Sequence, residues 1–416
     1  MDPSTRLLML THRFPFPPTS GDRIRSYNLL RFLASQYRVS LACTADEPVS
    51  DQQLSHVREM CEQVHVCPVG GVSRKARAAT AFARGKSLTE GMFHTPDLHK
   101  RVRDWHQRDP FDFVVVFCSS MYPYVDHPDF RVTPTIVDLV DVDSEKWTQM
   151  SVESVVGKRL VYAVEAKRVR ALERRIAEQA SSIVLVSDSE AELFRQVVAP
   201  AASVHGISNG VDTEYFCPGD QSTPAKEAGS TSVALRLVFT GVLSYPPNVE
   251  GISWFCEHVF PGIREQFPVE LEIVGRSPNA RVQSLAAIDG VTVVGEVPDV
   301  RPHLHHADVA ISPLKLARGI QNKVLEAMAC ELPVVVTTRS AEGIDAISGQ
   351  HLLVADNVAQ WQAAIAELAR QPNRRAVIGK SARQLVVSDY SWPARLSKFL
   401  DLIPDPPAAK SLSSPS

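Results

Sequence analysis

Short, uninterrupted apolar runs recur along the chain between longer amphipathic stretches, and this alternation constrains the fold more than any other feature. Each run is rich in valine, isoleucine or leucine. Runs of this kind are typical of parallel strands that are buried on both faces. Strands that alternate with helices favour an open, doubly wound α/β sheet. We predict strands at residues 6–10, 38–43, 113–118, 135–140, 182–186, 235–240, 269–274, 291–294, 309–312 and 333–337.

The alternation is interrupted once, which divides the chain into two domains. Residues 219–232 read GDQSTPAKEAGSTS, a polar segment without apolar period, and predict a linker. We predict Rossmann-like domains at 1–218 and 233–403, with the last helix of the second packing back on the first. The tail at 404–416 is rich in Pro, Ala and Ser and is predicted to be disordered. Two such domains facing each other across a cleft suit an enzyme with one substrate per domain.

Charge and cysteine content exclude several classes of protein. The 416 residues carry 44 basic and 47 acidic side chains, a net charge of −3, whereas nucleic-acid-binding proteins normally have a basic excess. The seven cysteines form no CxxC pair, which fits a reducing compartment better than a disulfide framework. No stretch reaches the roughly 18 apolar residues that span a bilayer. The N-terminus also lacks the pattern of a signal peptide. We therefore expect a cytoplasmic protein that does not bind nucleic acid.

The loop after the first predicted strand can bind an anion. It carries Gly21, Asp22 and Arg23 at the start of a predicted helix, with Arg13 and Arg25 nearby. A glycine lets backbone N–H groups approach a ligand, and a helix N-terminus favours negative charge. The other interpretation of the same residues is a proline-rich connector with solvated arginines.

Two glycine-containing turns follow strands at the start of the second predicted domain. Gly241 ends one strand and precedes a Pro-Pro pair, with Tyr245 before that pair and Asn248 after it as a possible helix cap. Gly275 follows the next strand, and Arg276 projects from its end. Arginine suits a bidentate grip on phosphate. A surface arginine in an ordinary turn is the equally simple alternative.

The segment at 312–328 carries the strongest local signal. A strand ends, a loop with Arg318 and Gly319 follows, and a helix begins near Asn322. Lys323 and Glu326 are three residues apart and share one face of that helix. Cations beside a helix N-terminus can hold a diphosphate, and a carboxylate one turn further can accept hydrogen bonds from sugar hydroxyls. On spacing alone, a solvated Lys–Glu pair explains the same pattern.

Together these segments resemble the GT-B glycosyltransferases, close to the large retaining group called family 4. Two further segments, HRFPFPPTSGDRIRS and VDLVDVDSEKW, resemble a narrower branch of sugar transferases associated with bacterial exopolysaccharide systems (PEP-CTERM/EpsH-type). The segments that resemble the larger group are, in the family's order, ISNGVDTEYF, GVLSYPPNVEGISWF, IVGRSP, GEVPDVRPHLHHADVAISPL and GIQNKVLEAMACELPVVVT.

The resemblance assigns roles to individual residues. Glu326 matches the second glutamate of the family's paired motif, which typically binds the nucleotide ribose. Arg318 stands where the family has its first glutamate, and the narrower branch has a Gly-x-x-x-Lys-x-x-Glu pattern that Gly319, Lys323 and Glu326 match. We predict Lys323, Arg318 and Glu326 as catalytic residues. The predicted donor-binding residues are Gly241, Tyr245, Asn248, Gly275, Arg276, Gly319 and Asn322, and the predicted acceptor or phosphate loop residues are Gly21, Asp22, Arg23 and Asp138.

The resemblance implies transfer of a sugar from a nucleotide-diphosphate sugar to a glycan or lipid-linked acceptor, without a cofactor or a metal and with retention. His303, His305 and His306 lie close in sequence, and a helix surface is favoured over a metal site. A nucleotide-sugar epimerase or phosphorylase of the same fold is one alternative, although no cofactor-lysine phrase supports the phosphorylase. A non-catalytic carbohydrate-binding partner in a polysaccharide assembly is another, and Arg318 in place of glutamate supports it.

Two basic stretches raise the possibility of contact with a membrane surface. Residues 74–86 place Arg and Lys among Ala and Phe, and residues 158–175 are basic on much of their surface. Either stretch could rest on anionic lipid while the acceptor is a lipid-linked sugar. Solvated helix faces are the favoured interpretation of both.

Overall fold

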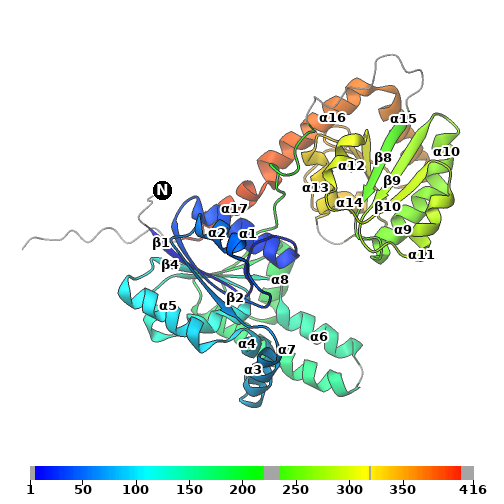
Figure 1. Cartoon of the computed structure of the whole chain (residues 1–416). Coiled ribbons are helices and arrows are strands. Elements are labelled where there is room, and N and C mark those ends of the chain that lie inside the picture. Colours follow the sequence, from blue (N-terminus) through cyan, green and yellow to red (C-terminus); the bar gives the residue numbers. More distant parts are fainter. Residues whose placement is uncertain (1–4, 155, 220–233, 318–319, 404–416) are drawn as a thin grey trace, which may run out of the picture. The chain divides into compact units, whose positions relative to one another are not determined.

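The computed structural model describes residues 5–154, 156–219, 234–317 and 320–403 (Figure 1). The chain divides into two compact units. Unit 1 consists of Met1–Asn209 together with Arg395–Ser416, and unit 2 of Gly210–Ala394. Most of the predicted linker and the whole predicted tail lie outside the described residues. Each unit is an α/β layered structure with helices on both faces of one sheet.

Unit 1 is built on a seven-stranded sheet in the order β3-β2-β1-β4-β5-β6-β7, and every neighbouring pair of strands is parallel. Leu8 and Leu10 of β1 belong to the same buried cluster as Leu98 and Val102 of α5. The strands are β1 (Arg6–Thr11), β2 (Arg38–Ala45), β3 (Gln63–Pro68), β4 (Phe113–Phe117), β5 (Thr135–Val140), β6 (Ser182–Leu185) and β7 (Val204–Gly206).

The helices of unit 1 are connected by short loops. They are α1 (Gly21–Ala34), α2 (Asp51–Arg58), α3 (Val72–Ala83), α4 (Leu88–Phe93), α5 (Pro96–Arg108), η1 (Ser119–Tyr124), η2 (Pro128–Phe130), α6 (Asp143–Glu153), α7 (Val156–Gln179) and α8 (Asp188–Val197). The last helix of the chain, α17 (Trp392–Leu400), crosses the division between the units, because the residues from Arg395 onward group with unit 1.

Unit 2 repeats the design with a six-stranded parallel sheet in the order β10-β9-β8-β11-β12-β13. Its strands are β8 (Leu235–Thr240), β9 (Val269–Val274), β10 (Val291–Gly295), β11 (Val309–Ser312), β12 (Val334–Val336) and β13 (Leu353–Val354). Its helices are α9 (Pro246–Trp254), η3 (Phe255–Val259), α10 (Phe260–Arg264), α11 (Ala280–Ser284), η4 (Leu285–Ala287), α12 (Arg301–His306), α13 (Asn322–Ala329), α14 (Thr338–Ala341), α15 (Val358–Arg370), α16 (Pro372–Leu385) and η5 (Val386–Tyr390).

In both units the strand order reverses beside the first strand. The chain winds outward from β1 to β3 and returns to β4, and it winds from β8 to β10 and returns to β11. In open α/β sheets the crevice outside the strand carboxyl ends at such a switch point is where ligands bind. A ligand site is therefore expected at the loops after β1 and β4 in unit 1 and after β8 and β11 in unit 2.

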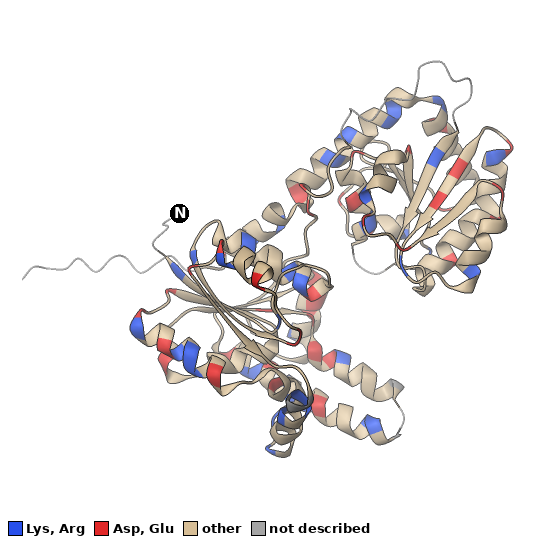
Figure 2. Cartoon of the chain, in the orientation of Figure 1, with Lys and Arg blue, Asp and Glu red and all other residues tan. Residues whose placement is uncertain are grey.

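All ten predicted strands are present, with ends that differ by at most two residues. The sequence does not predict three further strands, the six-residue β3 and the shorter β7 and β13. Acidic and basic residues are interspersed over both units (Figure 2). Within the residues that the structure describes, no helix has both the length and the hydrophobicity needed to cross a membrane.

Candidate functional site

Two glycine turns lie against each other at the carboxyl ends of β8 and β9. Gly241 has φ +155° and Gly275 has φ +152°, a region that favours glycine. A Cβ atom on Gly275 would stand 1.7 Å from the carbonyl oxygen of Gly241, and one on Gly241 would stand 2.9 Å from Asn248 Nδ2. Neither position accepts a side chain without movement of its neighbours. Both glycines predicted from sequence are therefore required for steric reasons.

Lys323 points toward the same turn from the first turn of α13. Its amino group donates a hydrogen bond of 2.5 Å to Asn248 Oδ1 and lies 4.5 Å from the centre of the Phe239 ring. A Cβ atom on Gly241 would be 3.0 Å from Lys323 Nζ, so the amine and the glycine turn are in close contact. Among the described residues, no carboxylate lies within the 4.0 Å of Lys323 that an ion pair requires. The structure therefore brings together Gly241, Asn248 and Lys323, which lie far apart in the sequence.

The pKa of Lys323 is lowered and the pKa of Glu326 is raised, so the two values are close to each other. Burial lowers the pKa of Lys323 to about 7, and the nearby Glu326 carboxylate opposes this shift. Burial also raises the pKa of Glu326 to about 7, against the effect of Lys323. Each residue as a whole is only half-buried, so the desolvation concerns the charged ends of the side chains. Groups of this kind respond strongly to a charged ligand, because the ligand replaces the lost solvation.

The N-termini of α9 and α13, which both lie at this switch point, differ in the number of backbone N–H groups that can donate to an anion. Helix α9 begins with Pro246 and Pro247, which have no N–H group, and the N–H groups of Asn248 and Val249 both bond to Tyr245 O. The predicted Asn248 cap is wrong, because Tyr245 occupies the cap position and the Asn248 side chain donates to Val242 O at 2.9 Å. The start of α9 is therefore a poor anion site.

Helix α13 is better placed to bind an anion. It begins at Asn322, as predicted, and the first intrahelical bond is from Val324 N to Gln321 O at 2.9 Å. The N–H groups of Asn322 and Lys323 have no bonding partner in the part of the chain that the structure describes. A helix N-terminus with open N–H groups beside an amine is the usual composition of a phosphate site. Arg318 and Gly319, predicted for the same site, lie outside the described residues.

The other predicted donor residues are on the surface of unit 2. Tyr245 and Asn322 have exposed side chains. Arg276 is also exposed at the end of β9, and its carbonyl accepts a 2.9 Å bond from Leu243 N. That bond joins the loop after β8 to the loop after β9. None of these three residues forms a described hydrogen bond with the Lys323 amine.

In unit 1, the loop after β1 holds a cluster of paired charges. Asp22 lies 3.3 Å from His12 Nε2, 2.7 Å from Arg13 Nη1 and 2.6 Å from Ser20 Oγ. The hydrogen bond from His12, with smaller contributions from Ser20 and Arg13, holds the pKa of Asp22 well below its usual range. Ser20 stands at the cap position of α1 but bonds to Asp22 instead of a backbone N–H. Asp22 therefore organises the loop as an ionised carboxylate.

The neighbouring basic residues are neutralised in the same way. Arg13 also contacts Asp46 at 3.1 Å, and Arg23 contacts Glu47 at 2.8 Å and Asp46 at 3.8 Å. Gly21 is exposed at the start of α1, and no atom lies within 4 Å of the position a Cβ would take. The structure gives no steric reason for glycine at this position.

Asp138 is fully buried on β5 and is paired with Arg25 of α1. The two side chains are 2.8 Å apart, and Arg25 also donates to Asn209 Oδ1 at 2.9 Å. The other carboxylate oxygen of Asp138 accepts the N–H of Val140 at 3.2 Å, where φ is +70°. Burial raises the pKa of Asp138, and Arg25 opposes this. Because it has no exposed surface, Asp138 is placed to hold this turn and Arg25 rather than to contact a ligand.

Solved structures with the same fold cover nearly the whole chain. Sucrose-phosphate synthase from Thermosynechococcus elongatus superposes with a TM-score of 0.60 over 95% of this chain and 98% of its own, at 16% identity. Anabaena HepE, solved in complex with UDP, gives 0.58 over 95% and 99%, at 14% identity. At this identity the likeness shows the fold alone.

Two domain families match the sequence. The one described as "Glycosyl transferase 4-like domain" matches residues 20–210, and "Glycosyl transferases group 1" matches residues 234–371. The matches fall on unit 1 and unit 2 and together cover most of the chain.

The chain has the GT-B fold and consists of two domains that match glycosyltransferase families. The predicted fold class, with two Rossmann-like units, is thereby confirmed. Among curated relatives, this chain is 25% identical over 246 residues to a GDP-mannose-dependent alpha-(1-6)-phosphatidylinositol monomannoside mannosyltransferase of Mycolicibacterium smegmatis. That alignment spans 55% of this chain and 64% of the relative, just under two thirds of its length.

Two residues of the unit 1 loop cluster were not predicted. His12 directly follows β1, and Asp46 directly follows β2. The carboxyl ends of parallel strands meet at one edge of a sheet, so a polar residue immediately after a predicted strand is the signal that could have identified both.

The three clustered histidines of unit 2 lie on α12 and face different partners. His303 Nδ1 contacts Glu272 Oε2 at 2.8 Å, His305 Nε2 contacts Cys217 O at 2.8 Å, and His306 contacts Arg236. All three stand at the helix surface, as expected from the sequence. Their nitrogens do not converge on one point.

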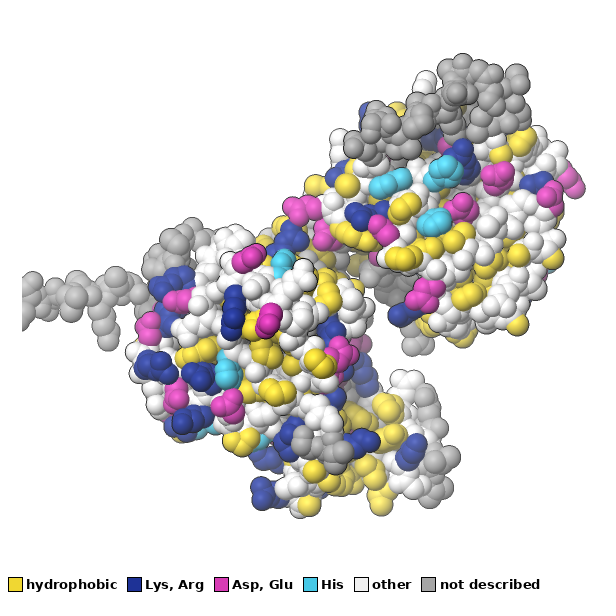
Figure 3. Space-filling view, in the orientation of Figure 1, with side chains coloured by type: hydrophobic (Ala, Val, Ile, Leu, Met, Phe, Trp, Pro, Cys, Tyr) yellow, Lys and Arg dark blue, Asp and Glu magenta, His cyan; other side chains and the backbone are white. Residues whose placement is uncertain are grey.

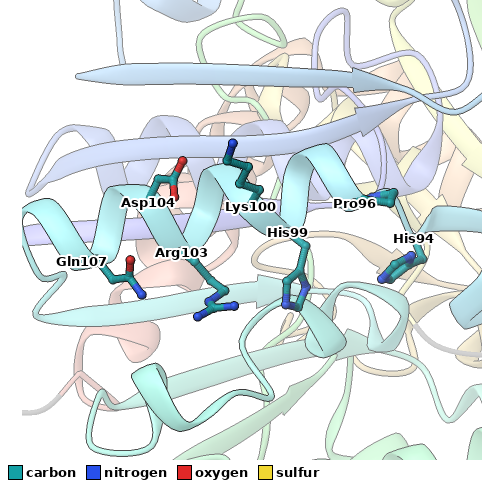
Figure 4. Close-up of a pocket in the computed structure, with 7 residues that line it drawn as sticks. All are labelled: His94, Pro96, His99, Lys100, Arg103, Asp104 and Gln107. Atoms are coloured by element: carbon teal, nitrogen blue, oxygen red, sulfur yellow. The ribbon is translucent and has the colours of Figure 1, made fainter.

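A pocket of about 410 Å³ lies along α5 of unit 1 and contains none of the predicted site residues. Figure 4 shows His99 and Arg103 on one side of the helix and Lys100 and Asp104 on the other. The residues that line it are His94, Pro96, His99, Lys100, Arg103, Asp104 and Gln107. His12, Arg13, Asp22 and Asp46 of the strand-end loops are not among the residues that line this pocket.

Proposed function

We propose that this glycosyltransferase moves a sugar from a nucleoside diphosphate sugar, bound at unit 2, to a glycan or lipid-linked acceptor that unit 1 helps to bind. The observation that carries the proposal is the amine of Lys323, which lies at the switch point of unit 2 beside the open N-terminus of α13 and, among the described residues, bonds to a neutral amide and to no carboxylate. A diphosphate would supply the negative charge that this amine lacks. Glu326, one turn further along α13, would accept hydrogen bonds from the nucleotide ribose.

The reaction needs stabilisation of the leaving diphosphate as the glycosidic bond breaks. Negative charge grows on the phosphate oxygens while the sugar takes on oxocarbenium character. A fixed ammonium group and helix N–H groups stabilise that charge most strongly in the transition state. Because these groups can supply the positive charge, we propose that turnover is independent of a divalent metal.

Retention of anomeric configuration is part of the proposal. It is supported by the sequence resemblance to retaining enzymes. Lys323 would hold the diphosphate on the face of the sugar that it leaves, and the acceptor hydroxyl would attack from that same face. We propose no covalent sugar–enzyme intermediate, since the groups placed at the glycine turns are an amine and an amide, Lys323 and Asn248.

A surface of unit 1 supports a lipid-linked acceptor. The helices α6 and α7 carry exposed apolar side chains at Met150, Val152, Leu160 and Val161, next to exposed Lys158 and Arg159. Figure 3 shows hydrophobic and basic side chains together in this region. Such a surface suits peripheral contact with anionic lipid at the cytoplasmic face of a membrane. The Mycolicibacterium relative, named for a phosphatidylinositol mannoside substrate, is consistent with an acceptor of this class.

We place the enzyme in exopolysaccharide or other cell-surface polysaccharide synthesis. The support is the segment VDLVDVDSEKW, which contains the buried Asp138, and the first-loop segment around Asp22. Both resemble the exopolysaccharide branch of the family.

One experiment distinguishes a transferase from the two alternative functions, an epimerase and a non-catalytic carbohydrate-binding partner. Purified protein is incubated with a panel of nucleotide sugars, with and without oligosaccharide and lipid-linked acceptors. A transferase releases nucleoside diphosphate in an acceptor-dependent manner, and NMR of the product gives its anomeric configuration. An epimerase changes the sugar without needing an acceptor, and a non-catalytic partner, which Arg318 in place of glutamate would favour, changes nothing. Repeating the assay with EDTA tests metal independence.

The matched variants are Lys323→Ala and Lys380→Ala, because Lys380 is an exposed lysine on α16 of the same unit. Loss of turnover in Lys323→Ala alone supports the proposed site. Equal turnover in both variants excludes Lys323 from the reaction and overturns the proposal.

A further inference from the structure

Three side chains with different metal-binding atoms converge at the edge of the unit 1 sheet. His65 and Cys67 alternate along β3, so they project from the same face of that strand, and Asp97 lies in the first turn of α5. His65 Nε2 is 2.9 Å from Asp97 Oδ2, and Cys67 Sγ is 3.3 Å from both atoms. The cluster is remote in sequence from every residue that we assign to sugar transfer.

These separations are close to those within a zinc coordination sphere. Zinc binds imidazole nitrogen at about 2.0–2.1 Å, thiolate sulfur at about 2.3 Å and carboxylate oxygen at about 2.0–2.2 Å, in a tetrahedron. Such ligand atoms lie roughly 3.3–3.8 Å from one another. The three atoms here would each move outward by only a few tenths of an ångström. One imidazole, one thiolate and one carboxylate leave the fourth position for water.

The surroundings hold the three side chains in place. Thr95 caps α5 by accepting the N–H of Leu98, and its hydroxyl also bonds to Cys67. His65 meets the edge of the Trp105 ring, with 6.3 Å between ring centres. Cys67 is buried, whereas Asp97 is exposed and leaves an entry path from solvent. Partners of this kind orient metal ligands.

We propose that His65, Cys67 and Asp97 bind a zinc ion that clips the edge strand β3 to the start of α5. The residues between Cys67 and Asp97 include α3 and α4, so the ion would close a chain segment of two helices at its base. β3 pairs with β2 on one side only, so it is an edge strand of the sheet that a metal ion could tether. Arg101 lies close enough to act electrostatically on Cys67 and Asp97, and its charge opposes the ion.

The test uses the full chain, stripped of metal and titrated with Co²⁺ as a spectroscopic substitute and then with Zn²⁺. We expect one saturable site per chain, with the near-ultraviolet absorption of a cobalt–thiolate bond that zinc displaces. Cys67→Ser should abolish this absorption, and Asp97→Asn should weaken binding by more than about tenfold. Arg101→Ala should tighten it. Zinc should raise the melting temperature of the wild type but not that of Cys67→Ser.

Cys61→Ser is the matched control, because Cys61 is a free, partly buried cysteine six residues before Cys67 that lies outside the cluster. It should keep the cobalt absorption. Circular dichroism establishes whether each variant is folded. If a variant on β3 does not fold, Asp97→Asn tests the site in its place, since the Asp97 side chain is on the surface. Absence of saturable binding in the wild type, or a thiolate absorption that persists in Cys67→Ser, overturns the proposal.

Discussion

The two units have the same topology but treat the charges at their strand ends in opposite ways. In unit 1 the basic residues after β1 and on α1 have carboxylate partners: Arg13 with Asp22 and Asp46, and Arg25 with Asp138. In unit 2, among the described residues, the amine of Lys323 bonds to the neutral Asn248 and to no carboxylate, and two N–H groups at the start of α13 have no described partner. The described charges after β1 are therefore paired with opposite charges, whereas the described amine at the strand ends of unit 2 is not.

This difference separates the tasks of the two units. A strand-end loop whose charges already compensate one another suits a neutral, hydroxyl-rich ligand, for which fixed hydrogen bonds are sufficient. A desolvated amine without a carboxylate partner costs stability, because burial disfavours its charged form. Such a cost is typical of a site whose partner is a ligand. The comparison thus supports the proposal that the acceptor binds to unit 1 and the diphosphate to unit 2.

The largest effect should follow when a pair in unit 1 is broken. Arg25→Ala leaves the carboxylate of Asp138 buried without its partner, and we expect a loss of about 3–5 kcal/mol in the free energy of unfolding. Urea denaturation measures it. Arg23→Ala on the same helix is the control and should cost less than about 1 kcal/mol, because its partner Glu47 is exposed. If the two variants are equally stable, the unit 1 charges are not structural.

Removal of the amine from unit 2 should act on catalysis instead. Lys323→Ala is expected to lower kcat by about 10²–10³ through loss of stabilisation of the leaving diphosphate. Its unfolding free energy should fall by less than that of Arg25→Ala, since among the described residues the Lys323 amine forms no ion pair within 4.0 Å. Steady-state kinetics and denaturation of the same preparation measure both quantities. A stability loss like that of Arg25→Ala would remove the contrast between the units.

The two units can also be compared by adding a methyl group at a glycine in the strand-end loop of each. Gly275→Ala puts a methyl group 1.7 Å from Gly241 O, so we expect about 2–3 kcal/mol of destabilisation and weaker donor binding. Gly21→Ala meets no atom within 4 Å and should be neutral or stabilising by about 0.5 kcal/mol. Thermal melts and calorimetric titration with nucleoside diphosphates check these values. Impaired acceptor use in Gly21→Ala would show that the backbone of this loop contacts the ligand.

The smallest expected effect is a pH dependence that only unit 2 should show. Above pH 7 the free enzyme loses the Lys323 proton, and below pH 7 Glu326 gains one, because burial moves both pKa values to about 7. The value of kcat/KM for the donor should therefore be bell-shaped near neutrality, with limbs approaching about tenfold per pH unit. In Lys323→Arg the alkaline limb should move to higher pH. A profile that is flat between roughly pH 6 and pH 9 would contradict the assignment.

The sequence predicts the parts of the fold that depend on local pattern. Continuous apolar runs such as 113–117 and 334–336 identify central strands, because both faces of these strands are buried. β3 was missed because its sequence, QVHVCP, alternates polar and apolar residues as an edge strand does. β7 and β13 consist of only three and two residues, too few for any periodicity.

Within the site, residue types could be predicted but their partners could not. The helix start at Asn322 and the Lys323–Glu326 spacing follow from local sequence. The bond from Lys323 to Asn248 joins residues 75 positions apart, and the Arg25–Asp138 pair joins residues 113 apart. Nothing in one sequence specifies such pairs, so the buried, paired role of Asp138 could be identified only from the structure.

The most direct test of the central claim is calorimetric binding of a nucleoside and its diphosphate to the wild type and to Lys323→Met. Methionine keeps the apolar stem of the side chain over Phe239 and removes only the charge. If the amine binds the diphosphate, the wild type should prefer the diphosphate by a large factor, and the variant should lose most of that preference while it binds the nucleoside equally well. An unchanged preference in Lys323→Met would show that the diphosphate is held elsewhere.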